Sequence, residues 1–462
     1  MTQLADLTAV ALLECYAHRT FSPVDVTQAV IRRAEAAEPQ LQALYAFDPE
    51  GAVEAARDSE QRWANGTQRA LEGVPVTIKE NIRSKGTAMP LGTAASVLKP
   101  ATDDAPPTAR LREAGAVLIG KTTMPDYGMT SSGLSSFHPL TRNPWDLTKN
   151  PGGSSAGAGA ATAAGYGPLH IGTDIGGSIR LPASWCGVFG MKPSFGRVPI
   201  DPSYFGRVAG PMTRTVRDAA LAMRELTKPD ARDAMCLPPQ RIDWLDLERD
   251  VKGLRLGFHL DAGTGLPVDA DVKPVIEQAV TCFADAGAIV EPMQPFFTRE
   301  MLDGMDRFFR QRAWLDLEAL PLERRQRVLP YIRDWAAAAE HFSGAQVFDG
   351  VSQMLAMRHA AVAASVPYDF VLSPVAPVAA FAAEWASPIN DPERPFEHIA
   401  FTLPYNMSEQ PSASINAGYT PVGLPVGLQI TGRRFDDLGV LQLAHAFERL
   451  RGPQKTWPTF AR

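Results

Sequence analysis

The chain has 462 residues, of which 45% are hydrophobic and 21% are charged, and its formal net charge is −6 with a pI near 5.8. This composition is that of a globular protein with a large core, and it lacks the basic surface of a protein that binds nucleic acid directly. No apolar run reaches the roughly 18 residues of a membrane helix, and the start MTQLADLTAV lacks the basic segment of a secretory signal, so we expect a cytoplasmic protein.

The chain shows no sign of a division into separate parts. Its length would allow about three domains of roughly 150 residues, but no Ser/Gly tract, charge run or low-complexity segment separates them. We therefore predict one domain over residues 1–462. The four cysteines form no C-x-x-C pair and the eight histidines have no metal-ligand spacing, so we expect neither a metal nor another cofactor.

Helical and strand-like segments alternate along the chain, which favours an α/β fold with helices packed on a sheet. Ser22 and Pro23 mark a helix start, with Ser22 as the N-cap and Pro23 in the first helical position. Lys79 follows the apolar segment 74–78 and is expected at the end of a buried strand. The other predicted strands are 116–119 and 169–174, and the other predicted helices are 154–164, opened by a serine cap, and 436–450.

Residues 296–365 differ from the rest, because aromatic residues and arginines are interleaved there at helical spacing. We interpret most of these aromatics as helix core rather than as the lining of a site. Substrate selectivity is expected to depend on this segment. The aromatics are Phe308, Phe309, Trp314, Tyr331 and Trp335.

Two serines in glycine-flanked runs and one lysine carry the strongest chemical signal. Ser154 follows Gly152-Gly153, Ser178 follows Gly176-Gly177, and Lys79 precedes both. A serine hydroxyl is a poor nucleophile at neutral pH and needs a base, which a lysine buried enough to lose its proton can supply. Together these groups supply what is needed to cleave an amide.

Two lysine-containing matches point to other chemistry. Residues 115–122 fit the P-loop spacing G-x-x-x-x-G-K-[ST], but the residues between the glycines are those of a strand and not of an exposed phosphate cradle. Residues 96–99 fit S-x-x-K but lack the S-D-N and K-T-G companions. A nucleotide binder that depends on Lys121 is therefore the least favoured hypothesis.

A third match centres on Ser155, which fits the G-x-S-x-G elbow of α/β-hydrolases. Asp369 and either His398 or His445 follow it in the chain order of that triad. The elbow requires a strand immediately before it, whereas residues 147–153 form turns, so we do not favour this triad.

Several segments together resemble the amidase signature family. The similarity extends from about residue 60 to the C-terminus, with 296–365 outside it, and the two serines lie 178 − 154 = 24 residues apart in flanking sequence that also fits. The resemblance implies an α/β fold with a mixed, twisted central sheet between layers of helices. The segments are GVPVTIKENI around Lys79, GKTTMPDYG from Gly120, TRNPWD at 141–146, PGGSSAGAGAATAAG from Pro151, GTDIGGSIRLPASWCGVFGMKPSFGRV from Gly172, and GLPVGLQITG at 423–432.

The resemblance also implies roles for individual residues. Ser178 would be the nucleophile, Ser154 the bridging serine after a cis peptide bond, and Lys79 the base. An acyl-enzyme would form on Ser178 and water would cleave it. The backbone amides of Ile175, Gly176, Gly177 and Ser178 would form the oxyanion hole, and substrate contacts are expected at Gly128, Met129 and Thr130.

The base role makes a physical demand on Lys79. Its pKa must fall from ~10.4 toward ~7–8, which requires roughly 4 kcal/mol of burial and hydrogen bonding. We therefore expect activity that increases toward alkaline pH.

The expected substrate is a small-molecule amide. Arg180 is interpreted as a structural partner of Asp174. A branch of the family that binds carboxylates has arginine where this chain has Leu181, which disfavours a small anionic substrate. The alternative function is an amidotransferase A-type subunit that acts with partner chains on aminoacyl-tRNA. Many relatives are homodimers, so a homodimer is a further expectation.

Overall fold

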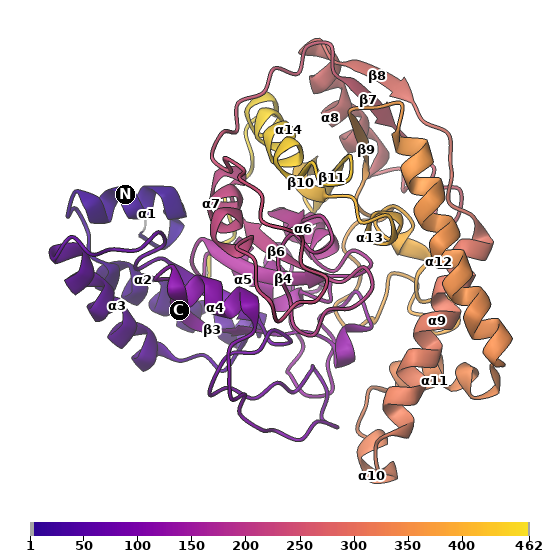
Figure 1. Ribbon diagram of the computed structural model, residues 1–462, viewed down its shortest axis with the longest axis horizontal. Helices are drawn as coiled ribbons and strands as arrows, with labels where there is room; N and C mark the ends of the chain where they lie inside the picture. The colour runs from indigo at the N-terminus through magenta and orange to yellow at the C-terminus, as the bar shows by residue number, and fades with distance from the viewer. Residues whose placement is uncertain (1–3, 461–462) are drawn as a thin grey trace.

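Eleven strands form one mixed sheet in the computed structural model, which describes residues 4–460 (Figure 1). Their order across the sheet is β1-β3-β2-β4-β6-β5-β10-β11-β9-β7-β8. The strands are β1 (Leu44–Tyr45), β2 (Pro75–Lys79), β3 (Val117–Thr122), β4 (Leu169–Asp174), β5 (Phe189–Lys192), β6 (Val208–Thr213), β7 (Arg255–Phe258), β8 (Ile289–Pro292), β9 (Phe370–Pro374), β10 (Ser412–Tyr419) and β11 (Pro425–Gly432).

The sheet combines parallel and antiparallel pairs. Strand β2 runs parallel to both β3 and β4, and β7 runs parallel to β8 and β9. The remaining neighbours are antiparallel, including β10 with β11 and β4 with β6. Because β2 and β4 are parallel, their carboxyl ends point to the same edge of the sheet, and the segments that follow the two strands begin there.

Helices cover both faces of the sheet, and the strand residues alternate accordingly. Phe189 and Met191 of β5 pack into the core on one face, whereas Gly190 between them faces Ile179 and Ala183 on the other. The longer helices are α1 (Ala9–Ala17), α2 (Pro23–Leu41), α3 (Pro49–Ala64), α4 (Pro106–Glu113), α5 (Ala156–Ala164), α6 (Arg180–Cys186), α7 (Val216–Leu226), α8 (Lys273–Asp285), α9 (Arg299–Glu318), α11 (Pro330–Ala337), α12 (Gly344–Ser365) and α14 (Asp437–Leu450).

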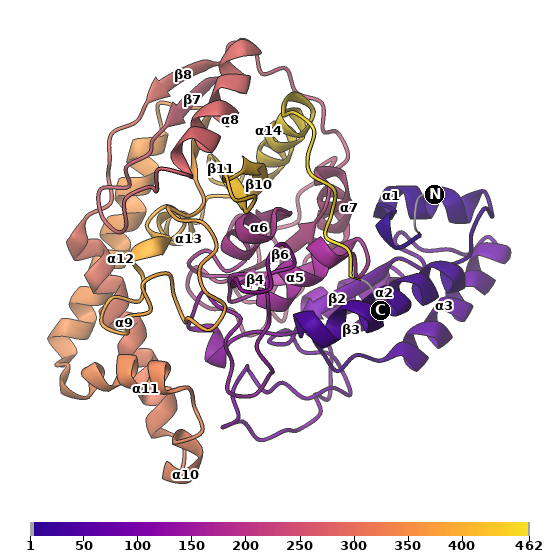
Figure 2. The ribbon, with the colours of Figure 1, turned by 180° about the vertical axis from the view of Figure 1, so that it is seen from behind.

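Short helices occur in the connections. They are α10 (Leu322–Arg325), α13 (Pro404–Met407) and the 3-10 turns Leu4–Asp6, Asp126–Gly128, Ala338–His341 and Glu397–Ile399. Both ribbon views place α1–α3 at one end of the molecule and α9–α12 at the other (Figures 1 and 2). The C-terminal segment returns to the N-terminal end, where Phe460 packs beside α2.

Helices α9 and α12 pack tightly against each other because glycine occupies the crossing. A Cβ on Gly350 of α12 would lie 2.7 Å from the Gly304 carbonyl oxygen of α9, which is closer than such contacts allow. This pair carries most of residues 296–365. Of the five aromatics of the segment, Phe309 on α9 and Trp335 on α11 are buried, whereas the other three are only partly buried.

The predicted elements are confirmed in type and place, with one correction. Strand β4 spans the predicted 169–174. Ser22 caps α2: its hydroxyl accepts from the amide of Asp25, and its own amide donates to the Asp25 carboxylate. Helix α5, however, begins at Ala156, and its N-cap residue Ser155 makes no side-chain capping bond. The expected serine cap was wrong, because the Ser155 hydroxyl forms hydrogen bonds with Lys79 and with the backbone of Thr173.

The α/β fold class is confirmed. Within residues 4–460 no helix is both long and apolar enough to cross a membrane. The assignment of one domain to residues 1–462 stays a prediction.

Candidate active site

Lys79 is the last residue of β2, and its side chain is fully buried. Its apolar neighbours in the strand, Val76 and Ile78, are 1% exposed. Ile78 pairs with Ile171 of β4, so the end of β2 lies beside the middle of β4. The strand pairing therefore brings Lys79 close to residues that come nearly a hundred positions later.

Two adjacent serine hydroxyls contact the amine of Lys79. Its Nζ lies 2.8 Å from Ser154 Oγ and 3.1 Å from Ser155 Oγ. The Gly153–Ser154 peptide bond is cis, as expected from the family pattern. Ser155 Oγ also donates to the carbonyl of Thr173 at 3.2 Å and accepts from the Thr173 amide at 3.2 Å. The contact with Lys79 explains why Ser155 does not cap α5.

The surroundings of Lys79 favour its neutral form. Burial is the largest effect and the positive charge of Arg207 the next, and together they lower the pKa of Lys79 well below its usual value. The charges of Asp174 and Glu80 act in the opposite direction but are outweighed. A neutral amine in hydrogen-bond contact with a serine hydroxyl can accept a proton from it.

Ser178 lies on the loop between β4 and α6, beside a cavity of about 550 Å³. Ser154, Thr173 and Ile175 line the same cavity. The Ser178 hydroxyl forms no hydrogen bond with any group in residues 4–460, so it is free to contact a molecule in the cavity. The structure thus gathers Lys79, Ser154 and Ser178, the three residues singled out in the sequence, at one place.

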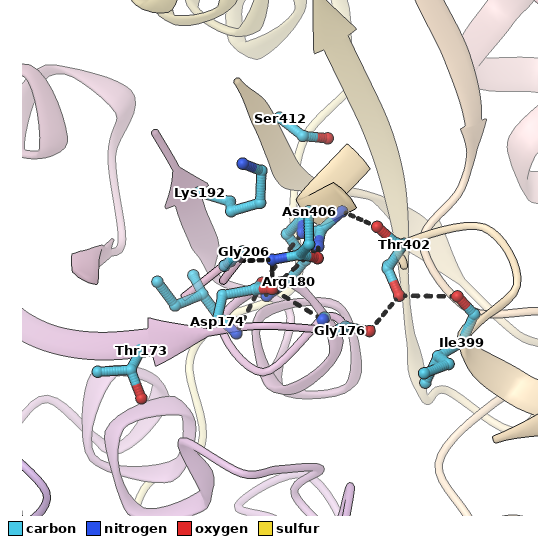
Figure 3. A network of polar contacts seen from close by, with 12 residues as sticks. Thr173, Asp174, Gly176, Arg180, Lys192, Gly206, Ile399, Thr402, Asn406 and Ser412 are labelled. Carbon is cyan, nitrogen blue, oxygen red and sulfur yellow. Dashed lines mark hydrogen bonds and ion pairs between the residues drawn. The ribbon is translucent and has the colours of Figure 1, made fainter. Parts of the chain in front are cut away.

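A buried ion pair holds this loop. Arg180 donates through Nε to Asp174 Oδ2 and through Nη2 to Oδ1, both at 3.0 Å, and both side chains are fully buried. Figure 3 shows the pair at the end of β4 with Asn406, which donates to Asp174 at 2.9 Å. Burial alone would raise the pKa of Asp174, but the charge and hydrogen bonds of Arg180 hold it below its ordinary value. The expected structural pairing of Arg180 with Asp174 is confirmed.

The carboxylate of Asp174 also fixes the backbone that follows it. It accepts from the amide of Gly177 at 2.8 Å and from the amide of Ile179 at 3.1 Å. Gly177 has a φ of +126°, and a Cβ there would lie 2.6 Å from Thr402 Oγ1, so only glycine fits. The expectation that the Gly177 amide points into an oxyanion hole is corrected, because that amide already donates to Asp174.

The predicted substrate contacts lie beside Ser178. Gly128, Met129 and Thr130 line a second cavity of about 50 Å³ together with Ser178. Apart from Ser131 and Gly176, its other walls are apolar, and Phe309 comes from α9 in the variable segment. A wall of this kind suits an apolar part of a ligand.

The competing motifs do not form sites. Lys121 lies within β3, and its Nζ donates to the carbonyl of Ile82 at 2.9 Å, so residues 115–122 form no phosphate loop. Within residues 4–460 neither His398 nor His445 bonds to Ser155, whose hydroxyl contacts Lys79 and the backbone of Thr173 instead.

Two contributions to the site have no signature in the sequence. Thr402 donates to the carbonyl of Gly176 at 2.7 Å and so steadies the loop of Ser178 from a distant part of the chain (Figure 3). Arg207 lies at the cavity and acts on Lys79 through its charge. In the sequence, only its place beside Ser154 distinguishes Ser155. The serine cap expected at this helix start gave no reason to expect the contact of Ser155 with Lys79.

A buried lysine whose amine contacts a serine hydroxyl beside a cavity is an arrangement by which a serine can be activated as a nucleophile. The family model described as Amidase matches residues 25–441, and this chain belongs to that family, the amidase signature enzymes. The A-type subunit of glutamyl-tRNA(Gln) amidotransferase from Myxococcus xanthus (strain DK1622) is 33% identical over 484 residues, which cover 97% of this chain and 98% of that protein.

Solved structures agree in fold. A bacterial aryl acylamidase of the amidase signature family superposes with a TM-score of 0.87 at 30% identity, over 96% of each chain. The A-type subunit of glutamyl-tRNA(Gln) amidotransferase from Thermotoga maritima gives a TM-score of 0.80 at 27% identity, over 100% of this chain and 99% of that one. Both confirm the expected family and its mixed sheet covered by helices.

Proposed function

We propose that this protein hydrolyses a carboxamide through an acyl-enzyme on Ser178, with Ser154 and Lys79 as a proton relay. The observation that carries the proposal is the contact of 2.8 Å between Lys79 Nζ and Ser154 Oγ, in a site where burial favours the uncharged amine. Ser178 shares the cavity with Ser154, so a substrate carbonyl can reach both.

The hydrogen bonds around Ser155 set the direction of the relay. The Ser155 proton goes to the Thr173 carbonyl, so its oxygen is an acceptor for the N–H of Lys79. The lone pair of the neutral amine is then available for the proton of Ser154, and Ser154 can in turn accept the proton of Ser178. Ser178 thereby becomes a nucleophile as its oxygen bonds to the carbonyl carbon.

The remaining steps use the same groups. The amides of Ile175, Gly176 and Ser178 are the donors proposed for the developing oxyanion, and one such donor is worth about 2.7–4 kcal/mol in the transition state. The proton on Lys79 returns through Ser154 to the departing amine as the C–N bond breaks. Water then attacks the ester on Ser178 and gives up a proton through Ser154 to Lys79. The relay returns that proton to Ser178 Oγ as the C–O bond breaks and the carboxylate leaves.

The test is release of ammonia or amine from a panel of aliphatic, aromatic, amino-acid and urea-type amides. Ser178→Ala and Lys79→Met should abolish turnover while leaving the circular dichroism spectrum unchanged. Lys121→Met is the matched control, since Lys121 is also a buried lysine but contacts only a backbone carbonyl. Turnover that survives in Ser178→Ala would contradict the nucleophile assignment.

The second candidate is the A-type subunit of a tRNA-dependent amidotransferase. The curated relatives, which are about a third identical over nearly the full chain, favour this function. In that case ammonia released at Ser178 would be used by partner chains. Amide hydrolysis by the isolated chain would support the free amidase, whereas activity that appears only with added partner chains and aminoacyl-tRNA would support the amidotransferase role.

A further inference from the structure

Two arginines from distant segments line the cavity of Ser178 without a carboxylate partner. Arg207 lies immediately before β6, and Arg312 lies on α9. Among residues 4–460, no carboxylate oxygen comes within 4.0 Å of either guanidinium group. Cations at a partly buried site are ordinarily paired, so two guanidinium groups without a carboxylate partner beside a nucleophile are suited to bind an anionic group of a ligand.

The groups that position these arginines leave their charge uncompensated. Arg207 donates to the carbonyl of Pro202 at 2.8 Å and to that of Asn81 at 3.3 Å. Arg312 lies over the ring of Tyr204, with 4.0 Å between its guanidinium carbon and the ring centroid. Carbonyl dipoles and an aromatic face orient a guanidinium but carry no negative charge.

The charges around the cavity mouth are unbalanced. Burial, and then the charge of Arg312, lower the pKa of Arg207 to about 10, so the two cations oppose each other. Asp316, one turn further along α9, also lines the cavity, and the charge of Arg312 acts on its carboxyl, but the two form no ion pair within 4.0 Å and Asp316 is exposed. Arg324 adds a third cation, and Asp201 is already paired with Arg83.

We propose that Arg207 and Arg312 bind the carboxylate of an anionic amide substrate whose other half is apolar. The proposal rests on the function proposed above and names its substrate class. The carboxylate would lie between the two guanidinium groups, and the apolar half would enter the cavity lined by Met129 and Phe309. Leu181 removes the arginine that carboxylate-binding relatives use, and these two arginines supply a different anchor.

The test compares acids with their neutral esters. N-benzoylglycine and N-phenylsuccinamic acid carry the carboxylate on opposite sides of the amide, and each has a methyl ester of nearly the same shape. In at least one pair, the acid should have a kcat/KM for amide cleavage that is roughly tenfold to a hundredfold higher, the range expected for hydrogen bonds to a charged group.

Arg312→Met should remove that preference, with a loss in kcat/KM that is roughly tenfold or more larger for the acid than for its ester, and Arg312→Lys should restore part of it. Arg307→Met is the control, because Arg307 lies on the same helix but pairs with Asp349 at 2.7 Å, away from the cavity. Equal cleavage of acid and ester in both pairs, or a loss in Arg312→Met that affects both alike, would overturn the proposal.

A binding measurement separates this proposal from the hydrolytic function. In Ser178→Ala, calorimetry should show that an acid binds more tightly than its ester, and adding Arg312→Met should abolish the difference. Charge-selective binding without turnover in the wild type would refute the hydrolysis of these amides and uphold the anion site. Binding that ignores the charge would overturn the anion site whatever the turnover.

Discussion

Replacement of Arg180 by methionine should destabilise the fold and lower the activity at the same time. The change removes the cation that neutralises Asp174, and both side chains have 0% exposure. A buried carboxylate left without its partner costs about 3–5 kcal/mol of unfolding free energy. The lost bonds to the carbonyl of Thr402 and to Gln429 Oε1 act in the same direction.

The effect on activity follows from what Asp174 holds. Its carboxylate fixes the amides of Gly177 and Ile179 on either side of Ser178, so an unpaired Asp174 would let the nucleophile move. A displacement of about 1 Å costs roughly a hundredfold in rate. We therefore expect kcat to fall by about that factor in the fraction of Arg180→Met that remains folded.

Urea unfolding measures the free energy of unfolding of each variant. The fraction of folded protein is then determined, and the observed kcat is divided by that fraction. Arg197→Met is the matched control, because Arg197 pairs with Asp437 at 3.0 Å with side-chain exposures of 5% and 0%, and neither residue lines the cavity. It should lose comparable stability and keep its kcat. A free energy of unfolding of Arg180→Met within about 1 kcal/mol of the wild type, which is the worth of one ordinary hydrogen bond, would contradict the role of the ion pair in stability. A loss of kcat in Arg197→Met as large as that in Arg180→Met would contradict its role in positioning Ser178.

Three further predictions concern the base and its supports. Because only neutral Lys79 accepts a proton, kcat/KM should rise with pH through the lowered pKa of Lys79, and a flat profile would contradict the lysine base. Arg207→Met removes a positive charge that lowers this pKa, so with uncharged benzamide as the substrate the rise in kcat/KM should move to higher pH. Ser155→Ala should lower kcat about tenfold through loss of one hydrogen bond to Lys79, and an unchanged kcat would exclude Ser155 from orienting the amine. Thr402→Val should lower kcat and cost about 1 kcal/mol of stability, while Thr402→Ser, which keeps the bond to Gly176, should match the wild type.

The sequence located the strands and the catalytic candidates well, because local patterns fix them. The apolar run before Lys79 and the run 169–174 are strands as predicted, since each is short, β-branched or apolar, and bounded by turn residues. The family-specific spacing of Ser154 and Ser178 predicted, without any knowledge of the fold, two serines that the structure places at one cavity. The serine cap expected for the helix at 154–164 was wrong: the helix begins at Ala156, and the hydroxyl at its N-cap position, Ser155, forms tertiary hydrogen bonds instead.

The order of residues along the chain therefore determined the family, the α/β class and the three groups proposed for catalysis. Only the tertiary structure decided that Asp174 takes the amide of Gly177, that Thr402 supports Gly176, and that Arg207 faces the same cavity as Arg312. The bond from Thr402 and the meeting of the two arginines join segments far apart in sequence, so they depend on how strands pair and helices pack rather than on neighbouring residues. Asp174 and Gly177 are three positions apart, but Arg180 and Asn406 hold the carboxylate that joins them.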